Sequence, residues 1–231
     1  MLRASAADRA YWMSQRARVT LPAPLQSAGA DAIGIDFSAV QVQMARNRYP
    51  SVRFEEGDAE ALPFDPQSFD AVVNGFGMHH FPNPDIALRE AFRVLKAGGR
   101  IAFTVWDKSA VGFGAVYAAI RAHGSLDVGL PTGPNFFFLS DTEQGTKALL
   151  TAGFVSPSCR QVPQVWLVSD PDEVFQSLVE GTVRAAATIR AQSPPAREAI
   201  RAAIRNAVAS YRRGDSHEVP MPATLATAVK P

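Results

Sequence analysis

Short β-rich runs alternate with helical patterns between residues 32 and 106, and this alternation constrains the fold more than any other feature. The β-rich runs cover residues 32–36, 52–56, 69–74 and 100–106, and the helical patterns cover residues 38–48 and 84–95. Such alternation is typical of βαβ units, in which crossover helices connect parallel strands. The sequence therefore predicts an α/β fold with a doubly wound, mostly parallel sheet.

The rest of the chain adds helices to this pattern. We expect helices over residues 111–123 and 141–152, a strand over 161–169, and two or three helices within 171–213, divided at Pro194-Pro195. A loop rich in Gly, Pro and Phe covers 128–139, and a last strand lies within 217–230, where prolines suit a sheet edge. These patterns predict one domain over residues 29–231, with a C-terminal helical insertion at about 171–213.

Composition and charge exclude several classes of protein. Of the 231 residues, 47% are apolar and 19% are charged, which is enough apolar material for a core. A net charge of +1 is atypical of a dedicated nucleic-acid or membrane-surface binder. The single cysteine, Cys159, excludes an intramolecular disulfide, and no apolar run is long enough to cross a bilayer. We expect a cytoplasmic protein that binds neither nucleic acid nor membrane.

Acidic residues follow two of the predicted strands, at the sheet edge where open α/β sheets bind ligands. Asp36 ends the first strand, and its carboxylate suits the two hydroxyls of a ribose, with capping of the next helix as the alternative. Asp58 follows the second strand, where it suits the amine of a purine ring beside the small Ala59, with a turn aspartate as the alternative. After the third strand, Gly75 allows the backbone to approach a ligand.

Five motifs follow one another in a specific order and spacing: G-I-D-x-S (34–38), G-D-A-x-x-L-P-F (57–64), S-F-D-A-V (68–72), M-H-H-F (78–81) and R-V-L-K-A-G-G-R (93–100). This pattern resembles class I S-adenosylmethionine-dependent methyltransferases, above all the small-molecule branch that includes ubiquinone and menaquinone biosynthesis methyltransferases. The resemblance implies a Rossmann-like methyltransferase fold, S-adenosylmethionine as cofactor and a small-molecule methyl acceptor, with the insertion at 171–213 over the acceptor pocket. It also implies a set of cofactor-binding residues: Asp36 at the ribose with Phe37 next to it, Asp58 and Ala59 at the adenine, and Asn74, Gly75 and Phe76 at the methionine end.

The glycine-rich loop with which that family begins, of the form V-L-D-x-G-x-G-x-G, is missing. Residues 1–27 contain no glycine, so we interpret residues 1–28 as an atypical segment in place of the first strand and its loop. We expect the chain either to fill the empty slot at the sheet centre with R-V-T-L, residues 18–21, or to lose stability.

The genetic code offers an explanation for the missing loop. Codons for Tyr11, Trp12 and Met13, read two bases later, encode Leu-Asp, and permitted synonymous codons turn residues 10–25 into V-L-D-V-A-T-G-T-G-Y-L-A-G-A-A. Two of the glycines require that the codons of Arg16 and Arg18 end in G. We therefore hypothesise a frame-shifted copy of the cofactor loop; the alternative is a divergent N-terminus that never carried it.

Two adjacent histidines, His79 and His80, follow the third strand and are the candidate catalytic residues, because an imidazole can act as a general base near neutral pH. Packing around the site is the alternative role, and without suitably spaced ligands we expect no metal. The run Phe136–Phe138 suits either an acceptor pocket or the core. The alternative functions are a non-catalytic methyltransferase remnant that acts as a binding protein, and a nicotinamide-dependent oxidoreductase, which the lack of G-x-G-x-x-G disfavours.

Overall fold

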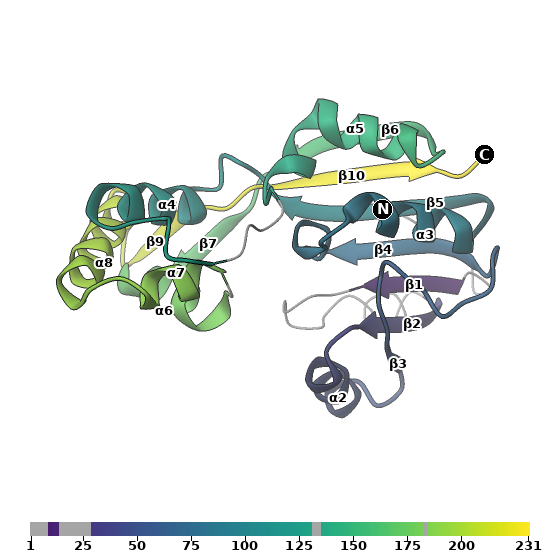
Figure 1. Ribbon diagram of the computed structural model, residues 1–231, viewed down its shortest axis with the longest axis horizontal. Helices are drawn as coiled ribbons and strands as arrows, with labels where there is room; N and C mark the ends of the chain where they lie inside the picture. Colours follow the sequence, from purple (N-terminus) through teal and green to yellow (C-terminus); the bar gives the residue numbers. More distant parts are fainter. Residues whose placement is uncertain (1–8, 14–28, 131–134, 183) are drawn as a thin grey trace. The chain divides into compact units, whose positions relative to one another are not determined.

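A mostly parallel sheet forms the core of one of the two compact units of the computed structural model, which describes residues 9–13, 29–130, 135–182 and 184–231 (Figure 1). Within these residues a seven-stranded sheet has the order β3-β2-β1-β4-β5-β10-β6. Its strands are β1 (Arg9–Met13), β2 (Asp31–Asp36), β3 (Arg53–Glu56), β4 (Phe69–Gly75), β5 (Leu95–Trp106), β6 (Val155–Val162) and β10 (Ala223–Val229). The pairs β3–β2, β2–β1, β1–β4 and β4–β5 are all parallel, which confirms the predicted doubly wound sheet.

The slot at the sheet centre is filled by β1, between β2 and β4. Residues 9–13 pair in register with residues 31–35 of β2, and residues 10–13 pair with 71–74 of β4. The expectation that R-V-T-L fills this slot is wrong, because residues 9–13 occupy it; residues 18–21 themselves lie outside the described residues. Because β1 occupies the centre, the backbones of β2 and β4 both have a pairing partner along their inner edges.

Strand β10 was expected at an edge, and this expectation is wrong. It lies between β5 and β6, and it runs antiparallel to β5, as the arrows in Figure 1 show. The amide of Gly98 donates to the carbonyl of Lys230, and the amide of Lys230 donates to the carbonyl of Gly99. Pro220 and Pro222 precede β10, so every residue of A-T-L-A-T-A-V retains an N–H for the ladder.

The large sheet is accompanied by three helices and two 3-10 turns. The helices are α2 (Ala39–Arg48), α3 (Pro84–Val94) and α5 (Thr142–Thr151), and the turns are η1 (Met78–His80) and η2 (Phe138–Ser140). The hydroxyl of Ser38 accepts the amide hydrogen of Gln41, so Ser38 is the N-cap of α2. Helix α3 begins with a proline in its first turn and buries Ala87, Leu88, Ala91 and Val94, one stripe at helical spacing. This stripe enters the core that holds β4 and β5 in place.

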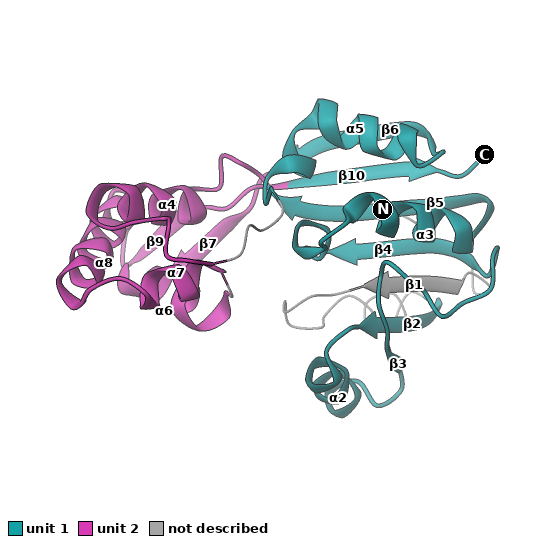
Figure 2. Cartoon of the chain, viewed as in Figure 1, with its two compact units in different colours: residues 1–106, 133–161, 224–231 teal, residues 107–132, 162–223 magenta. Residues whose placement is uncertain are grey.

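The chain divides into two compact units, which Figure 2 shows in different colours. The second unit comprises residues 107–132 and 162–223, with α4 (Val111–His123), α6 (Asp172–Gly181), α7 (Arg184–Arg190), α8 (Pro194–Ala209) and the antiparallel strands β7 (Val165–Val168), β8 (Arg212–Arg213) and β9 (Ser216–Pro220). Ile200, Ile204 and Val208 form one buried stripe of α8, in a cluster with Val116 and Ile120 of α4. The C-terminal helical insertion is thus present, and its compact unit also includes α4.

The strand predicted over 161–169 is two strands in two sheets. Strand β6 ends at Val162 in the large sheet, and β7 begins at Val165 in the small antiparallel one. Pro163 lies between them and lacks an amide hydrogen for either ladder. Apolar residues on both sides of Pro163 and Gln164 led to the prediction of a single strand.

Candidate functional site

Strand register brings the predicted site residues to one edge of the sheet. Ile35 pairs with Met13, Met13 pairs with Asn74, and Asn74 pairs with Phe103. The next residues, Asp36, Gly75 and Thr104, therefore lie at the same level, where β2, β4 and β5 end or approach their ends. Because these strands are parallel, their carboxyl ends form the edge at which open α/β sheets bind ligands.

Asp36 is 6% exposed at the end of β2. Its Oδ1 atom accepts the amide hydrogen of Ser38 at 2.9 Å, which satisfies one donor of the turn into α2. The neighbouring Phe37 has 53% of its surface exposed, so its ring is available at this edge. The capping contact and a ribose-binding role use the same carboxylate and are compatible, since each oxygen accepts more than one hydrogen bond.

Asp58 and Ala59 lie in a turn that is joined directly to Asp36. The amide of Gly57 donates to the carbonyl of Asp36 at 3.1 Å, which fixes the turn beside the end of β2. The exposed Asp58 accepts the amide hydrogen of Glu60 through Oδ1 at 2.8 Å, as a turn aspartate does, whereas Ala59 is buried in the core. The two predicted cofactor carboxylates therefore belong to adjoining segments.

Asn74 has a structural role that the sequence did not reveal. Its Oδ1 atom accepts the amide hydrogens of Gly77 and Met78 at 2.9 and 3.0 Å, and the residue is 2% exposed. A Cβ on Gly77 would come within 2.5 Å of Asn74 Nδ2, so glycine is required there. The oxygen of Asn74 is directed at the chain, and contact of Asn74 with the cofactor stays a prediction.

Phe76 follows β4 in the left-handed region, with a φ of 56°. Its amide donates to the carbonyl of Thr104, and its ring stacks on Trp106 with centroids 4.2 Å apart and planes at 27°. Thr104 and Trp106 belong to β5, and neither was among the predicted site residues. Because they are distant in sequence and carry no motif of their own, only the pairing of β4 with β5 reveals them.

His79 and His80 have different surroundings, although they are adjacent. His79 is 5% exposed and its ring lies 4.2 Å from that of Phe136, while His80 is exposed. Within the described residues, neither ring nitrogen of His79 has a hydrogen-bond partner. Burial, with a smaller contribution from His80, lowers the pKa of His79 to about 2. A neutral imidazole of such low basicity is a poor general base, which leaves His80 as the candidate at this position.

Phe136 and its neighbours bear on the predicted acceptor pocket. Phe136 lies against His79 and His80, and Phe138 packs against the core of the first unit. The aromatic run thus serves both the core and the surroundings of the histidines.

The described part of the chain holds no group of three or more His, Cys, Asp or Glu side chains suited to a metal. It also contains no helix that is both long and apolar enough to span a membrane.

Comparison with known proteins finds similarity to methyltransferases. Residues 18–103 match the methyltransferase domain family. A demethylmenaquinone methyltransferase of Renibacterium salmoninarum is 39% identical over 95 residues, which are 41% of this chain and 40% of that protein. The match to its curated relatives therefore spans less than half of their length. Residues 18–103 therefore carry the sequence signature of a methyltransferase domain, and the curated relatives that match this chain are methyltransferases.

Solved structures share the fold over nearly the whole chain. A putative methyltransferase from Bacillus halodurans aligns with a TM-score of 0.60 at 18% identity and covers 97% of this chain and 93% of that one. The phosphoethanolamine N-methyltransferase 2 of Haemonchus contortus, solved with S-adenosylhomocysteine, has a TM-score of 0.58 at 18% identity over 97% of this chain and 49% of that one. The Rossmann-like methyltransferase fold is thus confirmed, and the oxidoreductase alternative has no support.

Proposed function

We propose that this chain transfers the methyl group of S-adenosylmethionine to a small-molecule acceptor. The observation that carries the proposal is the common edge of β2, β4 and β5, which holds Asp36, Gly75 and Thr104 at one level, with the Asp58 turn bonded to Asp36. Two carboxylates on adjoining segments suit a ligand with a diol at one point and an exocyclic amine at another. An adenosine has both groups as hydrogen-bond donors, so the two acceptor carboxylates fit the cofactor.

Each residue of this edge would bind a different part of the cofactor. Asp36 would accept hydrogen bonds from the ribose, Asp58 would accept one from the adenine amine, and Gly75 would let the backbone approach the methionine end. When bound, the cofactor would supply a sulfonium whose methyl carbon the acceptor's nucleophile attacks, with S-adenosylhomocysteine as the leaving group, so the chain chiefly has to align the acceptor and exclude water. The low basicity of His79 agrees with a reaction governed by orientation.

The match to the curated relatives covers less than half of this chain and of those relatives, so the identity of the acceptor is a proposal of its own. We propose an aromatic small molecule, because the stacked Phe76 and Trp106 rings are only half buried at the carboxyl edge. Offset stacking on such a surface favours flat rings. The likeness to a demethylmenaquinone methyltransferase is consistent with a flat acceptor.

Titration calorimetry with S-adenosylhomocysteine tests the proposal. We expect a dissociation constant in the micromolar range for the unmodified chain, and no binding at millimolar ligand would favour the non-catalytic remnant. Asp36→Ala should weaken binding by roughly tenfold or more, since hydrogen bonds to a charged group contribute about 1.5–3 kcal/mol.

Asp31 provides the matched control. It begins the same strand, on the far edge of the sheet, so Asp31→Asn removes one negative charge without altering the carboxyl edge. We expect Asp31→Asn to bind S-adenosylhomocysteine like the unmodified chain. Equal losses in both variants would mean that net charge, and not the Asp36 contact, governs the affinity.

A further inference from the structure

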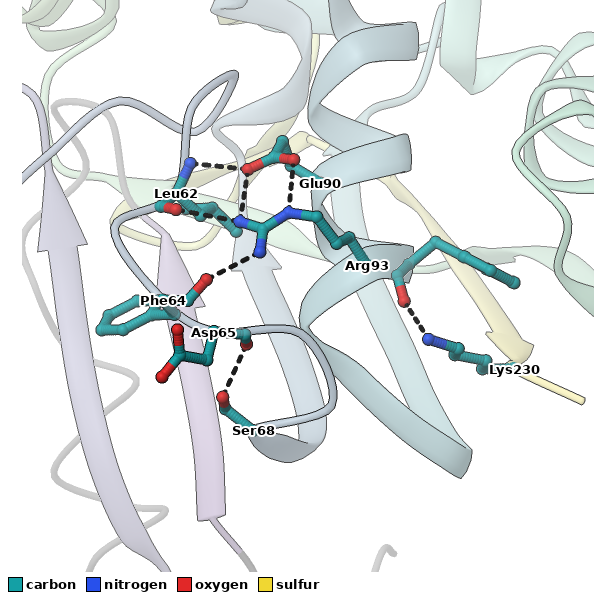
Figure 3. Close-up of polar contacts among 8 residues, drawn as sticks. Leu62, Phe64, Asp65, Ser68, Glu90, Arg93 and Lys230 are labelled. Atoms are coloured by element: carbon teal, nitrogen blue, oxygen red, sulfur yellow. Dashed lines mark hydrogen bonds and ion pairs between the residues drawn. The ribbon is translucent and has the colours of Figure 1, made fainter.

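A guanidinium on α3 holds the backbone of the loop that follows β3 (Figure 3). Arg93 donates through Nη2 to the carbonyl of Leu62 at 2.9 Å and through Nη1 to the carbonyl of Phe64 at 2.7 Å. These carbonyls lie a few residues after Asp58 and Ala59 in the same loop. The planar fork of arginine can reach both carbonyls at once, and the ammonium of lysine cannot reproduce this geometry.

Glu90 completes the contact from the preceding turn of the same helix. Its carboxylate accepts from Arg93 Nε and Nη2 at 2.7 and 2.8 Å, and it also accepts the amide hydrogen of Leu62 at 2.8 Å. The hydrogen bond to Arg93 lowers the pKa of Glu90 and the one to Glu90 raises the pKa of Arg93, so both are charged at neutral pH. Both polar backbone groups of Leu62 are thereby bound by charged side chains.

A second contact ties the start of this loop to the start of α3. Glu60 accepts the backbone amide of Asn83 at 2.7 Å and its side-chain amide at 2.9 Å. Leu62 is buried, and the Phe64 ring packs edge-on against Phe69 at 4.9 Å. The loop is therefore held at Glu60, Leu62 and Phe64, immediately after the Asp58–Ala59 pair.

We propose that Glu90 and Arg93 are positioning residues that hold the Asp58 turn in the geometry that recognises the adenine amine. This inference rests on the proposed cofactor function, and it assigns the selection of the base to a pair of residues on α3 that do not touch the ligand. Loss of the pair frees the loop after Asp58, so the carboxylate no longer meets the amine at a fixed distance. The preference for adenine over another base is then lost, whereas most of the stability of the fold remains.

The experiment compares two ligands: S-adenosylhomocysteine and its inosine counterpart, in which a carbonyl oxygen replaces the 6-amino group. The unmodified chain should prefer the adenosine compound, because the carboxylate of Asp58 accepts from an amine and repels a carbonyl oxygen. Arg93→Gln should lose roughly tenfold in affinity for the adenosine compound and little for the inosine compound, so that the preference disappears. Arg93→Lys should resemble Arg93→Gln, although it retains the charge.

Arg89 is the matched control, because it lies one turn earlier on α3 and is exposed. Arg89→Gln should keep the full preference for the adenosine compound. Glu90→Gln is the milder variant: its amide oxygen can still accept from Leu62, so it should fold even where Arg93→Gln does not and should retain only part of the preference. Melting temperatures show which variants are folded.

Three outcomes would contradict the proposed function, the base recognition and the positioning role, respectively. If the unmodified chain binds neither compound, the proposed function is wrong and the positioning role falls with it. If it binds both compounds equally, base recognition by the Asp58 turn is wrong. If it prefers adenosine, and the folded Arg93→Lys and Glu90→Gln variants show the same preference, only the positioning role is wrong.

Discussion

The indole of Trp106 and the ring of Phe76 stack with centroids 4.2 Å apart, and Phe76 holds this position with a φ of 56°. Left-handed backbone is unfavourable for a residue with a Cβ by about 1–2 kcal/mol. The amide of Phe76, donating to the carbonyl of Thr104 at 3.0 Å, helps to hold the residue in this conformation. The strain thus lies at the edge where we propose that the acceptor binds, as is common at ligand sites.

Substitutions at Phe76 separate the ring from the backbone strain. Phe76→Ala and Phe76→Gly both remove the ring, but only glycine adopts the positive φ without penalty. We expect the glycine variant to be more stable than the alanine variant by about 1 kcal/mol in denaturant unfolding. The exposed, mid-helix Lys147 in α5 is the control, where alanine should be the more stable of the two. The same order at both positions would contradict the strain at Phe76.

Gly77 should not tolerate a methyl group. The Cβ of Gly77→Ala would meet the buried Asn74 side chain at 2.5 Å, and this side chain already accepts two amide hydrogens of η1. We expect the free energy of unfolding to fall by about 1–3 kcal/mol, as for overpacked cores. Gly114 in α4 meets nothing within 4 Å, so Gly114→Ala should leave stability unchanged or raise it by up to about 1 kcal/mol. An unchanged melting temperature for Gly77→Ala would contradict the contact.

Features of the fold that depend on neighbouring residues could be predicted from the sequence, whereas features that depend on residues far apart in the chain could not. Asp36, Ser38 and the limits of α2 and α4 follow from neighbouring residues, because capping and apolar spacing are local signals. The place of β10 inside the sheet and that of β1 at its centre depend on pairings between remote segments. A single sequence does not encode these pairings in any short window.

The candidate site shows the same difference between residues predicted from local motifs and contacts between remote residues. Asp36, Asp58 and Gly75 are visible because each ends or follows a strand in a motif. The contacts of Arg93 with Leu62 and Phe64 join residues about thirty positions apart, and R-V-L-K by itself does not indicate what the arginine binds. The burial of His79 beside the exposed His80 also escaped prediction, because one residue along a 3-10 turn changes which side chain faces the core.

His79 makes the stability of the fold depend on pH. Its pKa is about 2 in the folded chain and about 6.5 when unfolded, so below about pH 6.5 the unfolded state binds a proton that the folded state does not. The contribution is full above that pH and is lost as the pH falls, by up to about 1.4 kcal/mol per pH unit. Unfolding measured from pH 7 to 4 should show this slope reduced in His79→Asn. The exposed His123→Asn variant should keep it, and parallel curves for the unmodified chain and His79→Asn would contradict the burial.

The central position of β1 sharpens the frame-shift hypothesis. Residues 9–13 occupy the slot between β2 and β4, and the Leu-Asp encoded two bases later falls on Tyr11 to Met13, at the end of this strand. Residues 14–28, where the glycines would follow, lie outside the described residues.

The frame-shift hypothesis predicts that the codons of Arg16 and Arg18 end in G, and any other third base contradicts it. A chain in which the sixteen residues 10–25 are replaced by the fifteen residues V-L-D-V-A-T-G-T-G-Y-L-A-G-A-A should bind S-adenosylhomocysteine roughly tenfold tighter or more, because bare backbone and free amides at the start of a helix favour the methionine carboxylate. The same replacement with alanine for each glycine changes the strand residues without supplying the bare backbone, and if it binds equally well, the glycines are not the missing element.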